Sequence, residues 1–232
     1  MNATVSFERD DGVFTNIRLA IKRNATTWRS GPLGLSYFSR PRVFVRDLDA
    51  DGELDVRLDT YTGGAHCCFK TRFFRWLPAR MSYARTFRNW GDAGYRAKNL
   101  DGRGPVELLS SDARFGYMFT AFAGSLFPIQ IWDFDTGRLR DVTRLFPGQV
   151  ELDAKGLWRT YLEHRRTDDV RGVLAAWVAD QFLLGRGDEG WATLRRLGVR
   201  GVFGPRPDLA GWPQGGAYLR ELRAFLVKLG YA

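Results

Sequence analysis

The sequence predicts a mainly β protein whose C-terminal part is α-helical. Short runs in which apolar and polar residues alternate, and a segment of about 50 residues that occurs twice, predict the β-part. A change to three- and four-residue apolar spacing after about residue 150 predicts the helices. The expected domains are a β-rich domain over 1–150 and a helical segment over 151–232 that caps it.

Residues 1–40 are predicted to form an N-terminal hairpin. The run VSFER is followed by a turn sequence, Asp10-Asp11-Gly12. Beyond the turn, apolar residues alternate with polar or small ones: Ile17, Leu19 and Ile21 against Arg18, Ala20 and Lys22. This period of two is typical of a strand with one buried face.

Two repeats follow the hairpin. VFVRDLDADGELDVRL (43–58) aligns with YRAKNLDGRGPVELLS (95–110) at an offset of 52 residues. The repeats are expected at about 41–92 and 93–145, and this period is typical of propeller-like blades. Alternation predicts strands around residues 54–58 and 115–121, and Asp135-Thr136-Gly137 predicts a hairpin turn.

The C-terminal segment is predicted to hold three helices. The first would start at Asp168 as N-cap and stop at Gly185, and the second would span 188–198 with Asp188 as its cap. The third, over 217–231, carries one apolar stripe: Tyr218, Leu222, Phe225, Leu226 and Leu229.

The loop DLDADGELD (47–55) predicts a calcium site. Asp47, Asp49, Asp51 and Asp55 lie at odd spacing around Gly52, which permits a sharp bend. Calcium takes six to eight oxygen ligands, so several carboxylates must converge within one turn. Without a cation, four crowded carboxylates would repel one another. The alternative is a solvated acidic turn between two strands. An EF-hand is excluded because its twelfth position, Leu58, is not Glu and the flanks are strand-like.

With two such loops on strands, residues 40–142 resemble the FG-GAP/VCBS repeat proteins, the calcium-loop β-propeller family. The resemblance implies that Ca²⁺ is bound by the Asp side chains of the first loop, with Glu53 supplying its carbonyl. Two blades are too few to close a propeller, so the architecture must close differently. In the second loop Arg103 replaces the third carboxylate and could neutralise Asp101 and Glu107, which predicts a metal-free loop.

Gly63-Gly64-Ala65-His66-Cys67-Cys68 has three interpretations. The cysteines could form a vicinal disulfide, which would force a tight backbone turn because adjacent Cα atoms are ~3.8 Å apart. They could join His66 in a soft-metal site, for which His164 is the only other histidine. They could also be reduced, on opposite faces of a strand. The chain also resembles uncharacterised, exported bacterial proteins that carry a GGAHCC segment.

Composition limits the partners. The net charge is +9, but only 5 of the 35 basic residues are Lys and the Arg residues are scattered, which argues against specific nucleic-acid binding. The sequence contains no run of ~18 apolar residues, so it predicts no membrane-spanning helix. The N-terminus lacks the features of a signal peptide, so the protein is either intracellular or was exported with a signal that is no longer present. The resemblance favours export or the cell envelope.

These observations predict a non-enzymatic binding or envelope-associated module, rigidified by Ca²⁺, with a protein or glycan ligand. The alternative is a metal-dependent hydrolase that uses the Asp-rich loop. For that alternative, Asp59 and His66 are the evident candidates for a nucleophile or general base.

Overall fold

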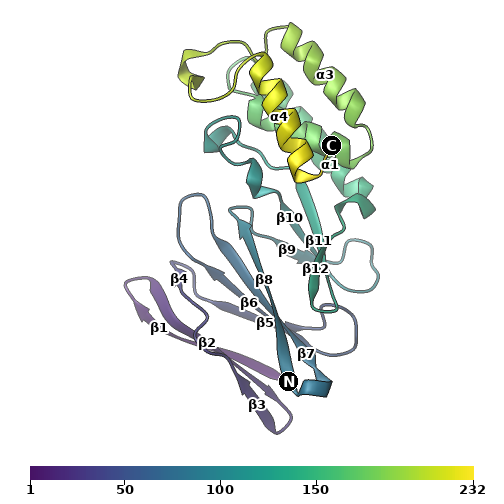
Figure 1. The fold of residues 1–232 in the computed structure, drawn as a ribbon. Helices are drawn as coiled ribbons and strands as arrows, with labels where there is room; N and C mark the ends of the chain where they lie inside the picture. Colours follow the sequence, from purple (N-terminus) through teal and green to yellow (C-terminus); the bar gives the residue numbers. More distant parts are fainter. The chain divides into compact units, whose positions relative to one another are not determined.

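The computed structural model describes all 232 residues, which divide into two compact units. Unit 1 comprises residues 1–110 and 132–141, and unit 2 comprises residues 111–131 and 142–232. The protein is mainly β, with three antiparallel sheets and four C-terminal helices (Figure 1).

The first sheet contains the expected N-terminal hairpin. Its strands β1 and β2 pair in antiparallel register, with Asp10 opposite Val13 across the turn at Asp11 and Gly12. Both turn residues have positive φ, which suits a tight hairpin turn that follows the twist of the strands. The sheet consists of β1 (Asn2–Asp10), β2 (Val13–Arg23), β3 (Thr26–Arg29) and β4 (Ser36–Tyr37), and β4 also pairs with β2.

The other two sheets are four-stranded meanders, one for each repeat. Each begins with a short strand and an acidic loop, and each continues strand by strand in chain order. The first meander contains β5 (Arg42–Arg46), β6 (Asp55–Tyr61), β7 (Phe69–Leu77) and β8 (Ser82–Gly91). The second contains β9 (Arg96–Lys98), β10 (Glu107–Ser111), β11 (Ile129–Asp135) and β12 (Arg138–Asp141).

Strand β7 has apolar side chains on both faces, so the first meander is buried on both sides. Phe74 packs in a cluster with Ile17, Leu19 and other residues of the first sheet. Phe73 packs in a second cluster and stacks on Phe134 of β11 at 5.0 Å between ring centroids. The three sheets are open and do not close into a propeller, because a propeller needs at least four blades around one axis.

Residues 115–121 do not form the predicted strand. They lie around two 3-10 helices, η2 (Ala113–Phe115) and η3 (Phe122–Gly124), in unit 2. The Asp112 carboxylate accepts a hydrogen bond from the Arg114 backbone N–H and so stabilises the first turn. Phe115 and Phe119 both enter the core of unit 2, so their spacing reflects a turn and not an extended chain.

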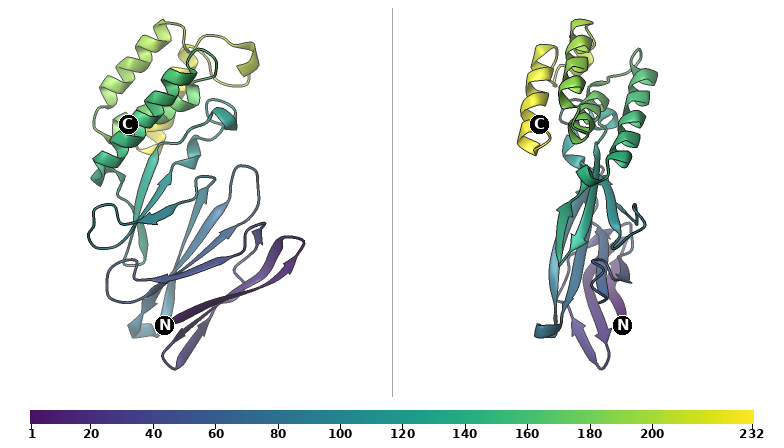
Figure 2. Two further views of the ribbon diagram at one scale, coloured as in Figure 1. Left: turned by 180° about the vertical axis from the view of Figure 1, so that it is seen from behind. Right: turned by 90° about the vertical axis from the view of Figure 1, so that its right-hand side faces the viewer.

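The other three helices of unit 2 pack around α2, whose residues are buried along most of its length (Figures 1 and 2). The predicted stripe on α4 enters this core: Tyr218, Leu222 and Leu226 are fully buried. The sequence prediction omitted α1, although Val150, Ala154, Leu157 and Tyr161 mark its buried face. The helices are α1 (Pro147–His164), α2 (Arg171–Leu183), α3 (Gly187–Val199) and α4 (Gly216–Leu229).

Helix α2 starts three residues after the predicted cap. Asp169, not Asp168, accepts a hydrogen bond from the backbone N–H of Arg171, the first helical residue, at 3.2 Å. The Asp168 carboxylate instead contacts His164 Nδ1 at the end of α1, at 2.6 Å. Gly185 does end the segment, with φ of +74°.

A buried carboxyl pair lies between α1 and α2. Asp180 is fully buried, and neither of its oxygens has a donor partner. Burial, then the neighbouring carboxylate of Asp153, raises the pKa of Asp180 to about 10. Asp153 Oδ2 accepts the Ile129 backbone N–H at 3.1 Å, so Asp153 suits the ionised member and Asp180 the protonated one.

Candidate metal centre

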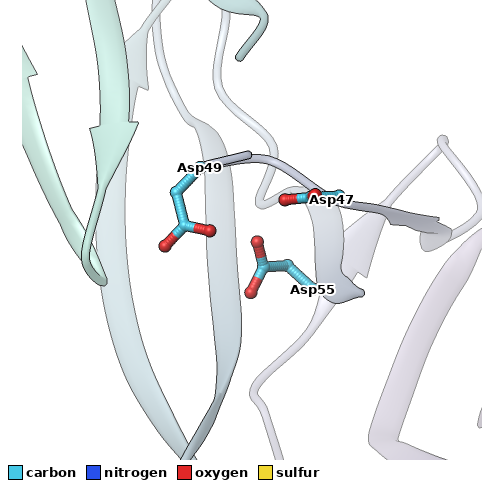
Figure 3. Close-up of side chains that lie close together, drawn as sticks. All are labelled: Asp47, Asp49 and Asp55. Atoms are coloured by element: carbon cyan, nitrogen blue, oxygen red, sulfur yellow. The ribbon is translucent and has the colours of Figure 1, made fainter. Parts of the chain in front are cut away.

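The acidic loop connects β5 to β6, and three of its carboxylates converge. Arg46 of β5 lies opposite Asp55 of β6, and this pair closes the base of the loop. Asp55 is the first residue of β6 and is buried. Ligand oxygens of Asp47, Asp49 and Asp55 lie within 4.8 Å of one another, and Figure 3 shows these side chains turned toward a common space. This is the donor set that a hard cation prefers.

Backbone hydrogen bonds fold the loop around these side chains. The Leu48 N–H donates to Asp55 Oδ2 and the Gly52 N–H donates to Asp47 Oδ2, both at 3.0 Å. Gly52 has φ of +85°, so the predicted bend is present. Two oxygens remain buried without a hydrogen-bond partner, namely Asp47 Oδ1 and Asp49 Oδ1. Such atoms are costly unless something else satisfies them.

The electrostatics of the loop are unfavourable to a full set of ionised carboxylates. Burial raises the pKa of Asp55 to about 7; repulsion from Asp49, Asp51 and Asp47 acts in the same direction, against the hydrogen bond from Leu48. A group whose charged form is disfavoured in this way gains from any nearby positive charge.

One such charge comes from the protein itself, and the sequence prediction did not include it. Arg75 on β7 donates from Nε to Asp49 Oδ2 at 2.7 Å and from Nη2 to Asp51 Oδ2 at 2.6 Å. The Asp49 side chain is only 2% exposed, so the Asp49 end of this ion pair is shielded from solvent. The hydrogen bond to Asp49 raises the pKa of Arg75. Arg75 therefore offsets one of the five acidic side chains in the loop.

Of the four Asp side chains predicted as ligands, three converge. Asp51 turns to Arg75, and its Oδ1 accepts the Glu53 backbone N–H at 2.8 Å. The Glu53 carboxylate pairs with Arg23 of β2. The candidate centre thus contains the carboxylates of Asp47, Asp49 and Asp55, while the side chains of Asp51 and Glu53 are engaged at its edge. The role of the Glu53 carbonyl as a ligand stays a prediction.

The second loop repeats the backbone geometry without the charge cluster. Leu100 N–H donates to Glu107 Oε2 at 2.7 Å, as Leu48 N–H donates to Asp55. Asp101 Oδ1 accepts the backbone N–H of Arg103 at 2.8 Å. The Arg103 side chain is exposed. With Asn99 in place of Asp47, this loop has fewer carboxylates to hold a cation.

Cys67 and Cys68 form a vicinal disulfide in the structure, in the β6–β7 loop. Cys68 has φ of +146°, which residues other than glycine rarely adopt. Its N–H donates to Gly91 O at 3.3 Å, and its O accepts the Thr62 N–H at 3.1 Å. Gly64 passes so close that a Cβ there would lie 2.7 Å from Cys67 Sγ. The loop is thus shaped around the disulfide.

We expect this disulfide in protein isolated without reductant, because the chain has no other cysteine with which either thiol could pair. Mass spectrometry after non-reducing alkylation should find the intact chain lighter by two hydrogen atoms and unmodified. Reduction before alkylation should add two adducts. Two alkylated cysteines in protein never exposed to reductant would contradict the expectation.

Of the two residues that the hydrolase alternative requires, Asp59 is engaged elsewhere. Asp59 is buried, and its Oδ1 accepts hydrogen bonds from Thr71 Oγ1 and Tyr95 Oη, both at 2.7 Å. His66 lies exposed in the β6–β7 loop. A soft-metal site at Cys67 and Cys68 is incompatible with the disulfide, because its ligands would have to be thiolates.

Comparison with known proteins gives a different relationship from the predicted one. The chain is 31% identical over 203 residues to a Synechocystis protein named probable thylakoid lumen protein sll0997, covering 81% of this chain and 59% of that protein. It is 30% identical over 148 residues to the uncharacterized protein y4bJ of Sinorhizobium fredii, covering 62% of this chain and 23% of that protein. The chain therefore spans less than two thirds of either relative. No solved structure matches.

The predicted membership in the FG-GAP/VCBS repeat proteins is wrong. The family model that matches the chain is described as the sll0997 C-terminal domain, and neither relative carries a repeat-family name. The prediction rested on an acidic loop between two strands, and unrelated β-sheets can contain the same local structure.

The four helices are each too short or too polar to span a membrane. Residues 150–230, which contain nearly all of the four helices, are similar to the sll0997 C-terminal domain.

Proposed function

We propose that this chain is a non-enzymatic binding module of an extracytoplasmic compartment, an envelope or a lumen, and that Ca²⁺ stabilises its β5–β6 loop. The observation that carries the proposal is the convergence of Asp47, Asp49 and Asp55, with buried oxygens on Asp47 and Asp49 that have no other partner. A calcium ion would satisfy these oxygens and offset the repulsion that raises the pKa of Asp55.

Two observations support the compartment. One relative is named as a probable thylakoid lumen protein. The vicinal disulfide fits an oxidising compartment, because disulfides persist there and are rare in the cytosol. A structural role for the ion is supported by Arg75, which covers the Asp49 side of the loop.

The proposal predicts calcium-dependent stability that is confined to the first repeat. If Kd is on the order of 0.1–1 mM, as in extracellular modules, then 1 mM Ca²⁺ stabilises the folded state by roughly 0.4–1.4 kcal/mol. In a chain of this size that raises Tm by a few degrees. Differential scanning calorimetry with EDTA and then with Ca²⁺ measures the shift.

The matched variants are Asp49→Ala and Asp101→Ala, which remove equivalent acidic residues from the two loops. Asp49→Ala should abolish the calcium-induced shift, and Asp101→Ala should leave it intact. A shift that both variants retain would place calcium outside the β5–β6 loop and would refute the proposed site.

A further inference from the structure

The loop between β6 and β7 contains a disulfide whose chemistry the calcium site does not use. Cys67 and Cys68 are bonded to each other and are both half-buried, and the three residues before them, Gly64, Ala65 and His66, are exposed. The loop that carries the bond therefore borders solvent. Thiol–disulfide exchange requires that a thiolate reach a disulfide sulfur, and a loop at the surface provides that access.

This bond does not act as a long-range cross-link of the fold. It joins two residues that are adjacent in the chain. In the chain-entropy account, a disulfide stabilises a fold because it closes a loop of the unfolded chain, and the effect shrinks as the loop becomes shorter. A bond between neighbours restricts only the backbone beside it. The effect of the bond on this protein is therefore local.

The local effect is on the backbone conformation of Cys68. Its φ of +146° lies in a region that residues other than glycine rarely adopt, so the chain without the bond does not favour it. In this conformation the Cys68 N–H donates to Gly91 O at 3.3 Å, and Cys68 O accepts the Thr62 N–H at 3.1 Å. Thr62 directly follows β6 and Gly91 ends β8, so one residue joins the ends of two strands. Return of Cys68 to negative φ would break both hydrogen bonds.

Phe69 connects Cys68 to the segment that links the two meanders. Its ring packs in the same cluster as Trp90 and Tyr95. The ring also covers Gly94, where a Cβ would lie 3.7 Å from two of the Phe69 ring atoms. Gly94 belongs to the connection between β8 and β9. A change in the backbone at Cys68 would therefore move the ring that packs on this connection.

We propose that Cys67 and Cys68 form a reversible redox switch, which is oxidised at rest and is opened by a dithiol reductant. The oxidised form holds the β6–β7 loop against the end of β8, and the reduced form releases the loop and loosens the β8–β9 connection. The switch is independent of calcium binding, since no residue of the β5–β6 loop takes part in these contacts.

The chemistry explains why the reductant is a dithiol. Its first thiolate attacks one cysteine sulfur, the Cys67–Cys68 bond breaks, and a mixed disulfide forms while the other cysteine leaves as a thiolate. The second thiol of the reductant attacks the mixed disulfide, so the reductant becomes a disulfide and two electrons and two protons pass to the cysteine pair. A monothiol is at a disadvantage, because the released cysteine is adjacent to the mixed disulfide and closes the ring again.

Amide hydrogen exchange of the full chain, followed in ¹H–¹⁵N spectra with and without millimolar dithiothreitol, tests the switch. Reduction should speed exchange of the Thr62 and Cys68 amides at least tenfold, because both lose their acceptors. Replacement of the dithiol by a disulfide oxidant should restore the original rates. A disulfide that dithiothreitol reduces only in unfolded protein, or reduction that leaves both amides as protected as before, would overturn the proposal.

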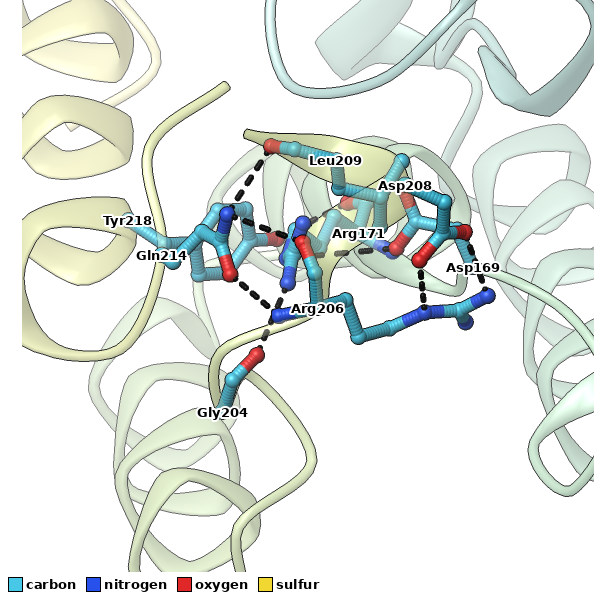
Figure 4. Close-up of polar contacts among 8 residues, drawn as sticks. All are labelled: Asp169, Arg171, Gly204, Arg206, Asp208, Leu209, Gln214 and Tyr218. Carbon is cyan, nitrogen blue, oxygen red and sulfur yellow. Dashed lines mark hydrogen bonds and ion pairs between the residues drawn. The ribbon is translucent and has the colours of Figure 1, made fainter. Parts of the chain in front are cut away.

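Two amides elsewhere in the chain serve as internal controls. The Leu100 N–H donates to Glu107 Oε2 at 2.7 Å in the second acidic loop. The Arg206 N–H donates to Gln214 Oε1 at 2.6 Å in unit 2 (Figure 4). Neither hydrogen bond involves the β6–β7 loop, so both amides should keep their exchange rates on reduction. Faster exchange at Arg206 to the same extent as at Thr62 would mean general unfolding and would overturn a local switch.

Two double variants separate the bond from the backbone that it holds. Cys67→Ser with Cys68→Ser should show the fast exchange of reduced wild type and should not respond to dithiothreitol. Cys67→Ser with Cys68→Gly also lacks the bond, but glycine adopts positive φ readily, so the Thr62 amide should exchange more slowly than in the serine pair. Slow exchange in the serine pair, equal to that of oxidised wild type, would refute the switch. Equal exchange in the two variants would refute the role of the Cys68 backbone.

Discussion

Asp180→Asn should stabilise unit 2 at neutral and alkaline pH by roughly 2–4 kcal/mol, a gain that disappears in acid. Burial raises the pKa of Asp180 from its ordinary 3.8 to about 10, so the folded state prefers the protonated carboxyl. In the wild-type protein, the contribution of Asp180 to the free energy of unfolding is present in full below about pH 4 and is lost as pH rises toward 10. Asparagine keeps the shape, supplies an N–H donor to Asp153, and has no proton to lose.

The measurement is urea unfolding followed by helical ellipticity between pH 5 and pH 8. The wild-type free energy of unfolding should fall with rising pH more steeply than that of Asp180→Asn. Asp188→Asn, on the exposed first turn of α3, is the control and should shift stability by a few tenths of a kcal/mol without changing the slope. Parallel pH profiles for wild type and Asp180→Asn would contradict a protonated, buried Asp180.

Gly172→Ala should destabilise the chain by on the order of 2–3 kcal/mol, because α2 approaches η3 too closely for a side chain there. A Cβ at Gly172 would overlap the backbone carbonyl oxygen of Gly124 and would lie 2.9 Å from Thr120 Cγ2. Since the obstacle is backbone, it cannot rotate away.

Gly156→Ala is the matched control on α1. No atom lies within 4 Å of a Cβ at this exposed position, so the same substitution should stabilise the helix by about 0.5–1 kcal/mol. Thermal unfolding of the two variants should therefore shift Tm in opposite directions. If Tm shifted in the same direction in both variants, helix propensity and not the contact with Gly124 would determine the effect of Gly172→Ala.

Features that depend on neighbouring residues were predictable from the sequence. The β1–β2 hairpin follows from the turn at Asp11 and Gly12 and from the alternation after it. The turn at Thr136 and Gly137, and the bend at Gly52, likewise need only local conformational preference. The stripe on α4 became buried because three- and four-residue spacing places it on one helix face.

Features that depend on distant residues were not predictable in this way. Arg75 reaches Asp49 from 26 positions away, and no local pattern relates the two. Phe115 and Phe119 fit a strand and a turn equally well until the core of unit 2 is known. Helix α1 did carry a signal in Val150, Ala154, Leu157 and Tyr161, but its exposed glycines and charged residues obscured it.

Equilibrium dialysis of EDTA-treated protein against millimolar calcium tests whether Asp47, Asp49 and Asp55 hold one Ca²⁺ ion. Wild type should bind one ion per chain and Asp49→Asn none. Arg75→Gln should bind one ion more tightly, because it removes the cation that competes for Asp49. Failure of the wild-type protein to bind calcium at 5 mM would contradict the calcium site and would leave Arg75 as the counterion of Asp49.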